Sequence, residues 1–247
     1  MKIYVGTSGF AYKEWKGTFY PEKVPPKEML RFYAERLRTV EINNTFYHMP
    51  NANVLASWAD QVPQDFLFAL KAPRMITHFK QLHNVSEETR YLFGTVPVLG
   101  RRLGPVLFQF PASFRLNAAL LKDFLDILPG RAACAFEFKN HGWTADAALD
   151  LLRAKGCGLC ISDEDESPAD GIISTAGWGY LRLRRSEYSD ADLGQWADRI
   201  LAQAWERAFV FFKHEGDAAG ADLAVRFQKL IDGRMEGQGT GELKKAG

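Results

Sequence analysis

Short runs of mostly apolar residues occur eight times in this chain, and apolar residues recur every three to four positions in the segments between them. The stretches are rich in Val, Ile, Phe and Tyr, which is typical of β-strands. The predicted strands cover residues 3–7, 39–43, 66–71, 105–110, 132–139, 157–163, 179–184 and 208–213.

The intervening segments have the period of amphipathic helices. Residues 193–201 and 223–231 place their apolar side chains at the i, i+3, i+4 and i+7 spacing that gives a helix one apolar face. The helical pattern is weakest over residues 86–100, where Gly94 and Pro97 interrupt it.

Eight strands that each precede a helix, in a chain of 247 residues, favour a TIM-like (β/α)8 barrel with parallel strands. An open, doubly wound sheet is the alternative, because it has the same alternation. No linker divides the chain, so residues 1–233 are predicted to form a single domain. Residues 234–247 are rich in glycine and polar residues and are predicted to be disordered.

In the stretch TVEINNTFYHMP, residues 39–50, the polar residues Glu41 and Asn43 alternate with the apolar residues of a strand that is expected to be buried. If Val40 and Ile42 face the surrounding helices, Glu41 and Asn43 point into the barrel. Both would then lie near the C-terminal ends of the strands, which is the face that carries the active site in TIM barrels. The stretch therefore predicts a site in the barrel mouth.

Charged and amide side chains lie near the ends of most other strands as well. The residues that we expect to reach the barrel mouth are Lys71, Gln109, Glu137, Lys139, Asp163, Arg182, Arg184 and Lys213. Each of them, taken singly, has an alternative role in an internal ion pair that only stabilises the fold. Their convergence favours a site, because unpaired charge is costly to bury and this rim carries many charges.

Positive charge exceeds negative charge in this set. Five cationic residues oppose three acidic ones, Glu41, Glu137 and Asp163. The excess favours a ligand with a phosphate or carboxylate group. The three acidic residues are candidate catalytic acids and bases. A carboxylate pair also suits glycoside hydrolysis, whose outcome depends on the separation of the carboxyl groups, a distance that the sequence does not contain.

Aromatic residues follow several of the predicted strands on the same side. Tyr12 and Trp15 follow the first strand, Tyr47 follows the second, and Trp143 follows the fifth. These rings either stack on a sugar or base at the rim or seal the barrel mouth by packing, and both interpretations stay open.

Composition and charge narrow the functional classes. A net charge of +1 argues against a protein that coats duplex DNA. No apolar run is long enough to span a membrane, and the N-terminus has no signal-peptide pattern. Three cysteines cannot all pair with one another, which favours the cytoplasm. Cys157 and Cys160 point to opposite faces of their strand and are interpreted as packing residues.

Sequence motifs give little support for a bound cofactor. No Walker loop, GxSxG elbow or GxGxxG after a strand occurs, so no nucleotide cofactor is predicted. A divalent metal is an alternative, because Glu41, Glu137 and Asp163 with a histidine such as His78 would suit magnesium, manganese or zinc. No HxH or HExxH pair accompanies them.

Several longer stretches together resemble one known family. GTSGFAYKEWKGTFYP, TVEINNTFYHMP, FLFALKAPRMITH, LGPVLFQFP, FEFKNHGW and ISDED occur in the order typical of the YecE-like family, domain of unknown function 72. The resemblance runs from Lys2 to about Ile231 and implies a TIM-like barrel with a cleft at the C-terminal ends of its strands, without an established reaction. The residues that match the family's motifs are Thr7, Gly9, Tyr12, Trp15, Glu41, Asn43, Thr45, Phe46, Tyr47, Lys71, His78, Gln109, Pro111, Glu137, Trp143, Asp163 and Arg182.

The last third of the chain departs from the family pattern. Many members resemble R-L-H-G where this chain has Arg182-Leu183-Arg184-Arg185, and F-N-N where it has Phe212-Lys213-His214. The differences replace a histidine and asparagines with cations, which favours a more anionic ligand.

Two functional hypotheses follow. The first is an enzyme acting on a small or oligomeric anionic substrate, with Glu41 and Glu137 as acid or base and the other polar and aromatic residues named above, together with Thr7 and His78, as ligand contacts. Glu137 is the stronger candidate for proton transfer if desolvation raises its pKa more than Lys139 lowers it. The second is a non-catalytic protein that binds a phosphorylated ligand or single-stranded nucleic acid. The oligomeric state stays open.

Overall fold

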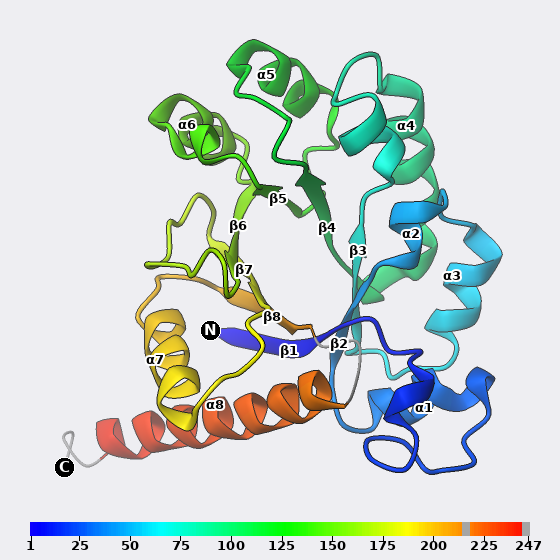
Figure 1. Ribbon diagram of the computed structural model, residues 1–247, viewed down its shortest axis with the longest axis vertical. Helices are drawn as coiled ribbons and strands as arrows, with labels where there is room; N and C mark the ends of the chain where they lie inside the picture. The colour runs from blue at the N-terminus through cyan, green and yellow to red at the C-terminus, as the bar shows by residue number, and fades with distance from the viewer. Residues whose placement is uncertain (214–217, 244–247) are drawn as a thin grey trace.

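A computed structural model describes residues 1–213 and 218–243. Within them, eight parallel strands close into a barrel in chain order, so that β1 pairs with both β2 and β8 (Figure 1). The strands are β1 Lys2–Ser8, β2 Thr39–Ile42, β3 Leu67–Lys71, β4 Leu103–Phe110, β5 Cys134–Phe138, β6 Gly158–Asp163, β7 Trp178–Leu183 and β8 Arg207–Phe212. The closed order confirms the TIM-like barrel over the open sheet.

Helices surround the barrel on its outside, and α8 lies along β1 and β8 (Figure 1). The α-helices are α1 Met29–Ala34, α2 Asn44–Tyr47, α3 Ala52–Ala59, α4 Ser86–Thr95, α5 Ala118–Ile127, α6 Asp146–Ala154, α7 Asp190–Leu201 and α8 Ala219–Leu243. Shorter helical turns are η1 Lys13–Trp15, η2 Pro26–Glu28, η3 Met75–Phe79, η4 Val96–Arg102 and η5 His141–Thr144.

The connection from β6 to β7 differs from the prediction that every strand precedes a helix. Residues 164–177, all of them described, form turns and a loop without a helix. Pro168 lacks the N–H that a helix interior needs, and Gly171 lowers helix propensity. Without an apolar stripe to bury, this segment has no reason to be helical.

The inward faces of the strands carry two kinds of side chain. Toward the N-terminal ends of the strands, apolar residues fill the barrel, among them Ala69, Leu107, Ala135, Cys160, Tyr180 and Phe211. The next inward positions toward the C-terminal ends are polar, namely Lys71, Gln109, Glu137, Ser162, Arg182 and Lys213. A packed apolar floor therefore supports a polar layer in the barrel mouth.

The outward faces pack against the helices. Val40, Ile42, Phe108 and Phe136 are buried there, as their alternation with polar residues predicts. Cys157 belongs to this outer core whereas Cys160 lies inside the barrel, which confirms that the two thiols diverge.

The helix α8 continues past Gly233, the predicted end of the domain, to Leu243. Residues 244–247, the last part of the tail predicted to be disordered, lie outside the described residues, and so does His214. The domain boundary at residue 233 stays a prediction.

Candidate functional site

Arg182, on β7, is buried in the barrel mouth and joins two carboxylates. Its Nη2 donates to Oε1 of Glu41 at 2.9 Å, and its Nη1 donates to Oε2 of Glu137 at 2.6 Å. Glu41 also accepts hydrogen bonds of 2.7 Å from Ser8 Oγ and from Tyr180 OH. Side chains from β2 and β5 thus meet at one guanidinium from β7, with Ser8 of β1 bound to Glu41, and both glutamates face the barrel interior as the alternation predicts.

The three buried charges keep one another ionised. Burial raises the pKa of a carboxyl group and is the largest single influence at Glu41 and Glu137, but the Arg182 charge together with their other partners outweighs it, so both pKa values lie below their usual range. Lys139 lowers the pKa of Glu137 further. The raised pKa considered for Glu137 is therefore not found, and neither carboxyl is suited to donate a proton at neutral pH.

A second group of charges surrounds Glu164, which follows β6. Its Oε1 lies 2.7 Å from Lys139 Nζ and 2.7 Å from Arg184 Nη1, and it accepts a hydrogen bond of 3.1 Å from Ser162 Oγ. Lys139 Nζ also lies 2.8 Å from Glu137 Oε1. The two groups of charges therefore form one network across the barrel mouth.

Glu164 and Ser8 are site residues that the sequence did not identify. Both could have been found from the alternation alone, because Glu164 is in phase with the inward Cys160, and Ser8 with the small inward Gly6. An added Cβ on Gly6 would lie 2.0 Å from the carbonyl oxygen of Thr39, so only glycine fits there.

Asp163 and Thr7 occupy the neighbouring outward positions, which corrects their placement in the barrel mouth. Oδ2 of Asp163 accepts hydrogen bonds from Tyr188 OH at 2.9 Å and from Trp196 Nε1 at 3.2 Å. Oγ1 of Thr7 lies 2.9 Å from Tyr33 OH, on α1. A shift of one residue along a strand moves a side chain to the opposite face, so the adjacent Ser8 and Glu164, and not Thr7 and Asp163, point into the barrel.

Lys71 ends β3 with a different environment from the other cations. Its Nζ lies 4.0 Å from the centroid of the Phe46 ring, and its carbonyl oxygen accepts a hydrogen bond of 2.7 Å from Thr45 Oγ1. Burial, and then the charge of Arg182, lower the pKa of Lys71 to about 8, against the opposing effect of the buried carboxylates. The ring of His78 meets the same Phe46 ring edge-on, with a centroid distance of 4.9 Å.

Other predicted contacts lie around this network. Gln109 Nε2 donates to Glu137 Oε1 at 3.1 Å, and Tyr12 OH donates to the Ser8 carbonyl at 2.6 Å. Asn43 and Lys213 are partly buried just after β2 and β8. The structure thus brings most of the predicted polar residues to the mouth of the barrel.

The two predicted indole contacts are packing residues. Trp15 and Trp143 are each 1% exposed. Trp143 stacks on Phe138 with a centroid distance of 4.4 Å and donates Nε1 to the Phe114 carbonyl at 2.7 Å. Trp15 packs edge-on against Phe19. Both rings therefore fit the interpretation in which aromatic residues seal the barrel by packing, because an indole covered on its faces has no surface left for a ligand. Tyr47, by contrast, is 58% exposed.

A cavity opens beside the network between β5 and β6. These strands pair at two positions, Ala135 with Gly158 and Phe136 with Leu159, whereas β4 and β5 pair at five. The strands separate toward their C-terminal ends, and a cavity of about 570 Å³ lies there, lined in part by Lys139 and Glu164. The network is therefore reachable from outside the barrel.

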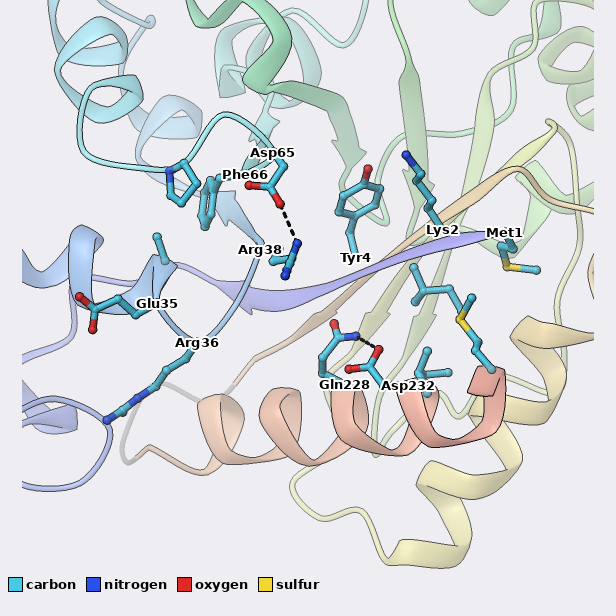
Figure 2. Close-up of a pocket in the computed structure, with 15 residues that line it drawn as sticks. Met1, Lys2, Tyr4, Glu35, Arg36, Arg38, Asp65, Phe66, Gln228 and Asp232 are labelled. Atoms are coloured by element: carbon cyan, nitrogen blue, oxygen red, sulfur yellow. Dashed lines mark hydrogen bonds and ion pairs between the residues drawn. The ribbon is translucent and has the colours of Figure 1, made fainter. Parts of the chain in front are cut away.

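A larger hollow, of about 660 Å³, lies at the opposite end of the barrel, where β1 begins and α8 passes (Figure 2). Arg38 and Asp65 form an ion pair of 2.6 Å at its edge, and Gln228 donates to Asp232 at 2.8 Å (Figure 2). Both interactions are exposed to water, so this hollow has the character of an ordinary polar surface.

Metal ligands do not gather in this arrangement. Within residues 1–213 and 218–243, no three His, Cys, Asp or Glu side chains are close enough together to hold a metal ion. Glu41 and Glu137 bind Arg182, and Asp163 faces outward, so the candidate metal ligands are separated.

Comparison with known proteins places the chain in a family. The family described as protein of unknown function DUF72 matches residues 4–246. The chain belongs to the DUF72 family. This DUF72 chain is 24% identical over 272 aligned positions to UPF0759 protein YunF of Bacillus subtilis (strain 168), covering 93% of the chain and 95% of YunF. It is 30% identical over 155 positions to UPF0759 protein YecE of Escherichia coli (strain K12), covering 62% of the chain and 54% of YecE.

Solved DUF72 structures have the same fold. A DUF72 family protein from Thermotoga maritima superposes with a TM-score of 0.82 at 27% identity, covering 94% of this chain and all of the other. One from Enterococcus faecalis gives a TM-score of 0.76 at 18% identity, covering 93% of this chain and 95% of the other. The family description assigns no reaction. In the described part of this DUF72 chain, no helix has the length and apolar character needed to cross a membrane.

Proposed function

We propose that this DUF72 protein is an enzyme that binds a small anionic substrate, through a phosphate or carboxylate group, in the barrel mouth. The cations Lys71, Lys139, Arg184 and Lys213 anchor the substrate above Arg182. The location agrees with the face at which TIM barrels carry their active sites.

The observation that carries this proposal is the charge balance of the inward-facing layer. Its five cations are Lys71, Lys139, Arg182, Arg184 and Lys213, and its three carboxylates are Glu41, Glu137 and Glu164. The excess of cations matches that expected from the sequence, with Glu164 in the place of Asp163. Buried ion pairs add little net stability, because desolvation offsets their attraction. A layer of this kind is better explained by an anion that binds to it.

The two buried carboxylates act by holding charge rather than by moving protons. A glycosidase general acid needs a raised pKa, whereas the pKa values of Glu41 and Glu137 are lowered, since Arg182 and their other partners together outweigh burial. They fix the guanidinium of Arg182 and keep it charged. Lys71, with a pKa of about 8 set by burial and Arg182, is better matched to proton transfer near neutral pH.

One observation favours a second candidate, a non-catalytic protein that binds single-stranded nucleic acid. Tyr47 and Phe79 are exposed, and the guanidinium of Arg74 lies 5.6 Å from the first ring and 5.1 Å from the second. Exposed rings with an adjacent arginine are suited to stack on bases. This function predicts strongly salt-dependent binding of oligonucleotides that Tyr47→Ala and Phe79→Ala weaken together.

Thermal unfolding with inorganic phosphate, sulfate and acetate tests the first proposal. An anion at ten times its Kd adds about 1.4 kcal/mol of stability, which raises the Tm of a chain of this size by about 3–6 °C. Lys71→Met is expected to reduce the shift, because it removes one of the five cations of the barrel mouth. The matched control is Lys122→Met on α5, which removes a lysine that pairs with Asp126 on the protein surface.

Sodium chloride at equal ionic strength separates specific binding from screening. Equal Tm values in chloride and in all three test anions would contradict the proposed function. A shift that Lys122→Met reduces as much as Lys71→Met would contradict its location.

A further inference from the structure

The cations of the barrel mouth differ in whether they have a carboxylate partner. Arg182 pairs with Glu41 and Glu137, and Lys139 and Arg184 both pair with Glu164. Lys71 belongs to the same inward layer, but no carboxylate of the described residues lies within ion-pair distance of its Nζ. An amine without a counter-ion in a partly buried position is the cation least restrained from reacting.

The neighbours of Lys71 hold it in place without neutralising it. On one side, the Phe46 ring lies 4.0 Å from Nζ, and Thr45 ties the start of α2 to the Lys71 carbonyl. The charged groups that act on it are Glu41 of β2, Glu137 of β5, Arg182 of β7, and Arg184 just after β7. The nearest elements therefore offer an apolar wall, two carboxylates already bound to arginine, and two like charges.

His78 contacts the same aromatic ring as this amine. Burial, together with the charges of Lys71 and Arg74, lowers the pKa of His78. The imidazole is therefore neutral at pH 7 and can accept a proton. Lys71, with a pKa of about 8 that results from burial and from Arg182, has an appreciable neutral fraction at the same pH.

We infer that Lys71 is a nucleophile that forms an imine with an aldehyde or ketone group of the anionic substrate. This inference rests on the proposed function and assigns its substrate class, a small carbonyl compound that also carries a phosphate or carboxylate. The paired cations of the rim hold the anionic group, and Lys71 is left to meet the carbonyl carbon.

The step is balanced without any further reactant. The Nζ lone pair of neutral Lys71 forms a C–N bond as the carbonyl π bond breaks, and His78 passes the proton that the nitrogen loses to the oxygen, which gives a carbinolamine. His78 then accepts the second proton of the nitrogen. It passes this proton to the hydroxyl group, which leaves as water while the C=N bond forms. No oxidation or reduction occurs.

Borohydride trapping of the intact chain tests this inference. Pyridoxal phosphate is the probe, because it carries both an aldehyde and a phosphate, and the reduced adducts are located by peptide mass spectrometry. We expect Lys71 to be labelled on the order of tenfold faster than Lys122 at neutral pH, because more of its amine is neutral. The labelling rate of Lys71 should be half-maximal near pH 8.

Two variants sharpen the result. Lys71→Arg keeps the positive charge but cannot form an imine, so the adduct at this position disappears while phosphate binding persists. His78→Gln slows labelling of Lys71 and leaves that of Lys122 unchanged. Circular dichroism shows whether each variant is folded. If a variant does not fold, the comparison of Lys71 with Lys122 in the unmodified chain still tests the inference.

The outcomes separate this inference from the proposed function. Fast labelling of Lys71 that excess inorganic phosphate slows supports both. Equal labelling of Lys71 and Lys122 overturns the imine, while phosphate binding measured by calorimetry leaves the proposed function standing. Fast labelling that phosphate does not affect also overturns the inference, since it shows a reactive amine without the anionic substrate on which it rests.

Discussion

At the C-terminal ends of the strands, Arg182 is 1% exposed and its two ion pairs are closed off from water. At the N-terminal end, Arg38 and Asp65 form an ion pair whose side chains are 74% and 62% exposed. The cavities at these two ends are of similar size, about 570 and 660 Å³. Volume alone therefore does not distinguish them.

The two ends differ in what their charges cost. An exposed ion pair is screened by water and has little effect on stability. A buried one must be compensated by close partners, and removal of one partner leaves an uncompensated charge. The barrel mouth contains buried ion pairs, which are costly to leave uncompensated, whereas the hollow in Figure 2 contains an exposed ion pair that affects stability little. Buried charge, rather than open space, is therefore what distinguishes the proposed site from the hollow at the other end.

The largest expected difference between the two ends concerns their arginines. Arg182→Met is expected to lower the free energy of unfolding by about 3–5 kcal/mol, because Glu41 and Glu137 would stay buried without a counter-ion. Arg38→Met at the exposed pair is expected to cost about 0–1 kcal/mol. Urea unfolding of both variants measures the difference.

Adding Glu41→Gln and Glu137→Gln to Arg182→Met removes the uncompensated charges, so part of the lost stability should return. This triple variant also serves if the single variant is too unstable to measure. Similar losses of unfolding free energy for Arg182→Met and Arg38→Met would contradict the difference between the two ends of the barrel.

The second expected difference is in the response to acid. The folded pKa of Glu137 is lowered, because Arg182 and Lys139 outweigh burial, so the unfolded chain binds the proton more tightly. The stability that Glu137 contributes is therefore complete above the ordinary glutamate pKa of about 4.3 and is lost as pH falls below it. We expect this loss to be about 2 kcal/mol.

Urea unfolding between neutral pH and pH 3 should show a shallower pH dependence for Glu137→Gln than for the natural chain. The matched control is Asp65→Asn, whose exposed ion pair is screened by water and should change the slope less. Parallel pH profiles for the natural chain and Glu137→Gln would contradict a role for this carboxylate in acid stability.

The smallest expected effect is a gain in stability rather than a loss, and it concerns Lys71. The folded pKa of Lys71 is lowered to about 8 by burial and Arg182, so its charged form is disfavoured in the folded chain. This penalty is complete below pH 8 and is lost as pH rises toward the ordinary lysine pKa of about 10.4. Lys71→Met is therefore expected to stabilise the protein at pH 7, by about 1 kcal/mol after allowance for solvent screening.

The control for this prediction is Lys2→Met in the exposed hollow of Figure 2, expected to change stability by less than about 0.5 kcal/mol. The gain from Lys71→Met should shrink as the pH is raised toward 10. A destabilised Lys71→Met variant would show that the lysine supports the fold rather than a ligand.

Much of the barrel follows from local pattern. The alternation around Glu41, Lys71, Glu137 and Arg182 determines which faces they occupy, because successive side chains of a strand point to opposite sides. Thr7 and Asp163 do not follow from this rule: the family resemblance indicated Thr7 and the end of the sixth strand indicated Asp163, whereas their neighbours Ser8 and Glu164 are in phase with inward residues. Strand ends are where local pattern is weakest.

The sequence by itself determined the alternation of strands and helices and the inward placement of most of the charges, since these depend on periods of two and 3.6 residues. Closure of the sheet into a barrel is a property of the tertiary structure, because an open sheet has the same alternation. Only the tertiary structure decided that Arg182 binds both Glu41 and Glu137, that Glu164 holds Lys139 and Arg184, and that Lys71 has none of these carboxylates as a partner. Ion pairing and pKa depend on distance and on exclusion of water, and closure of the barrel sets both among residues that lie far apart in the chain.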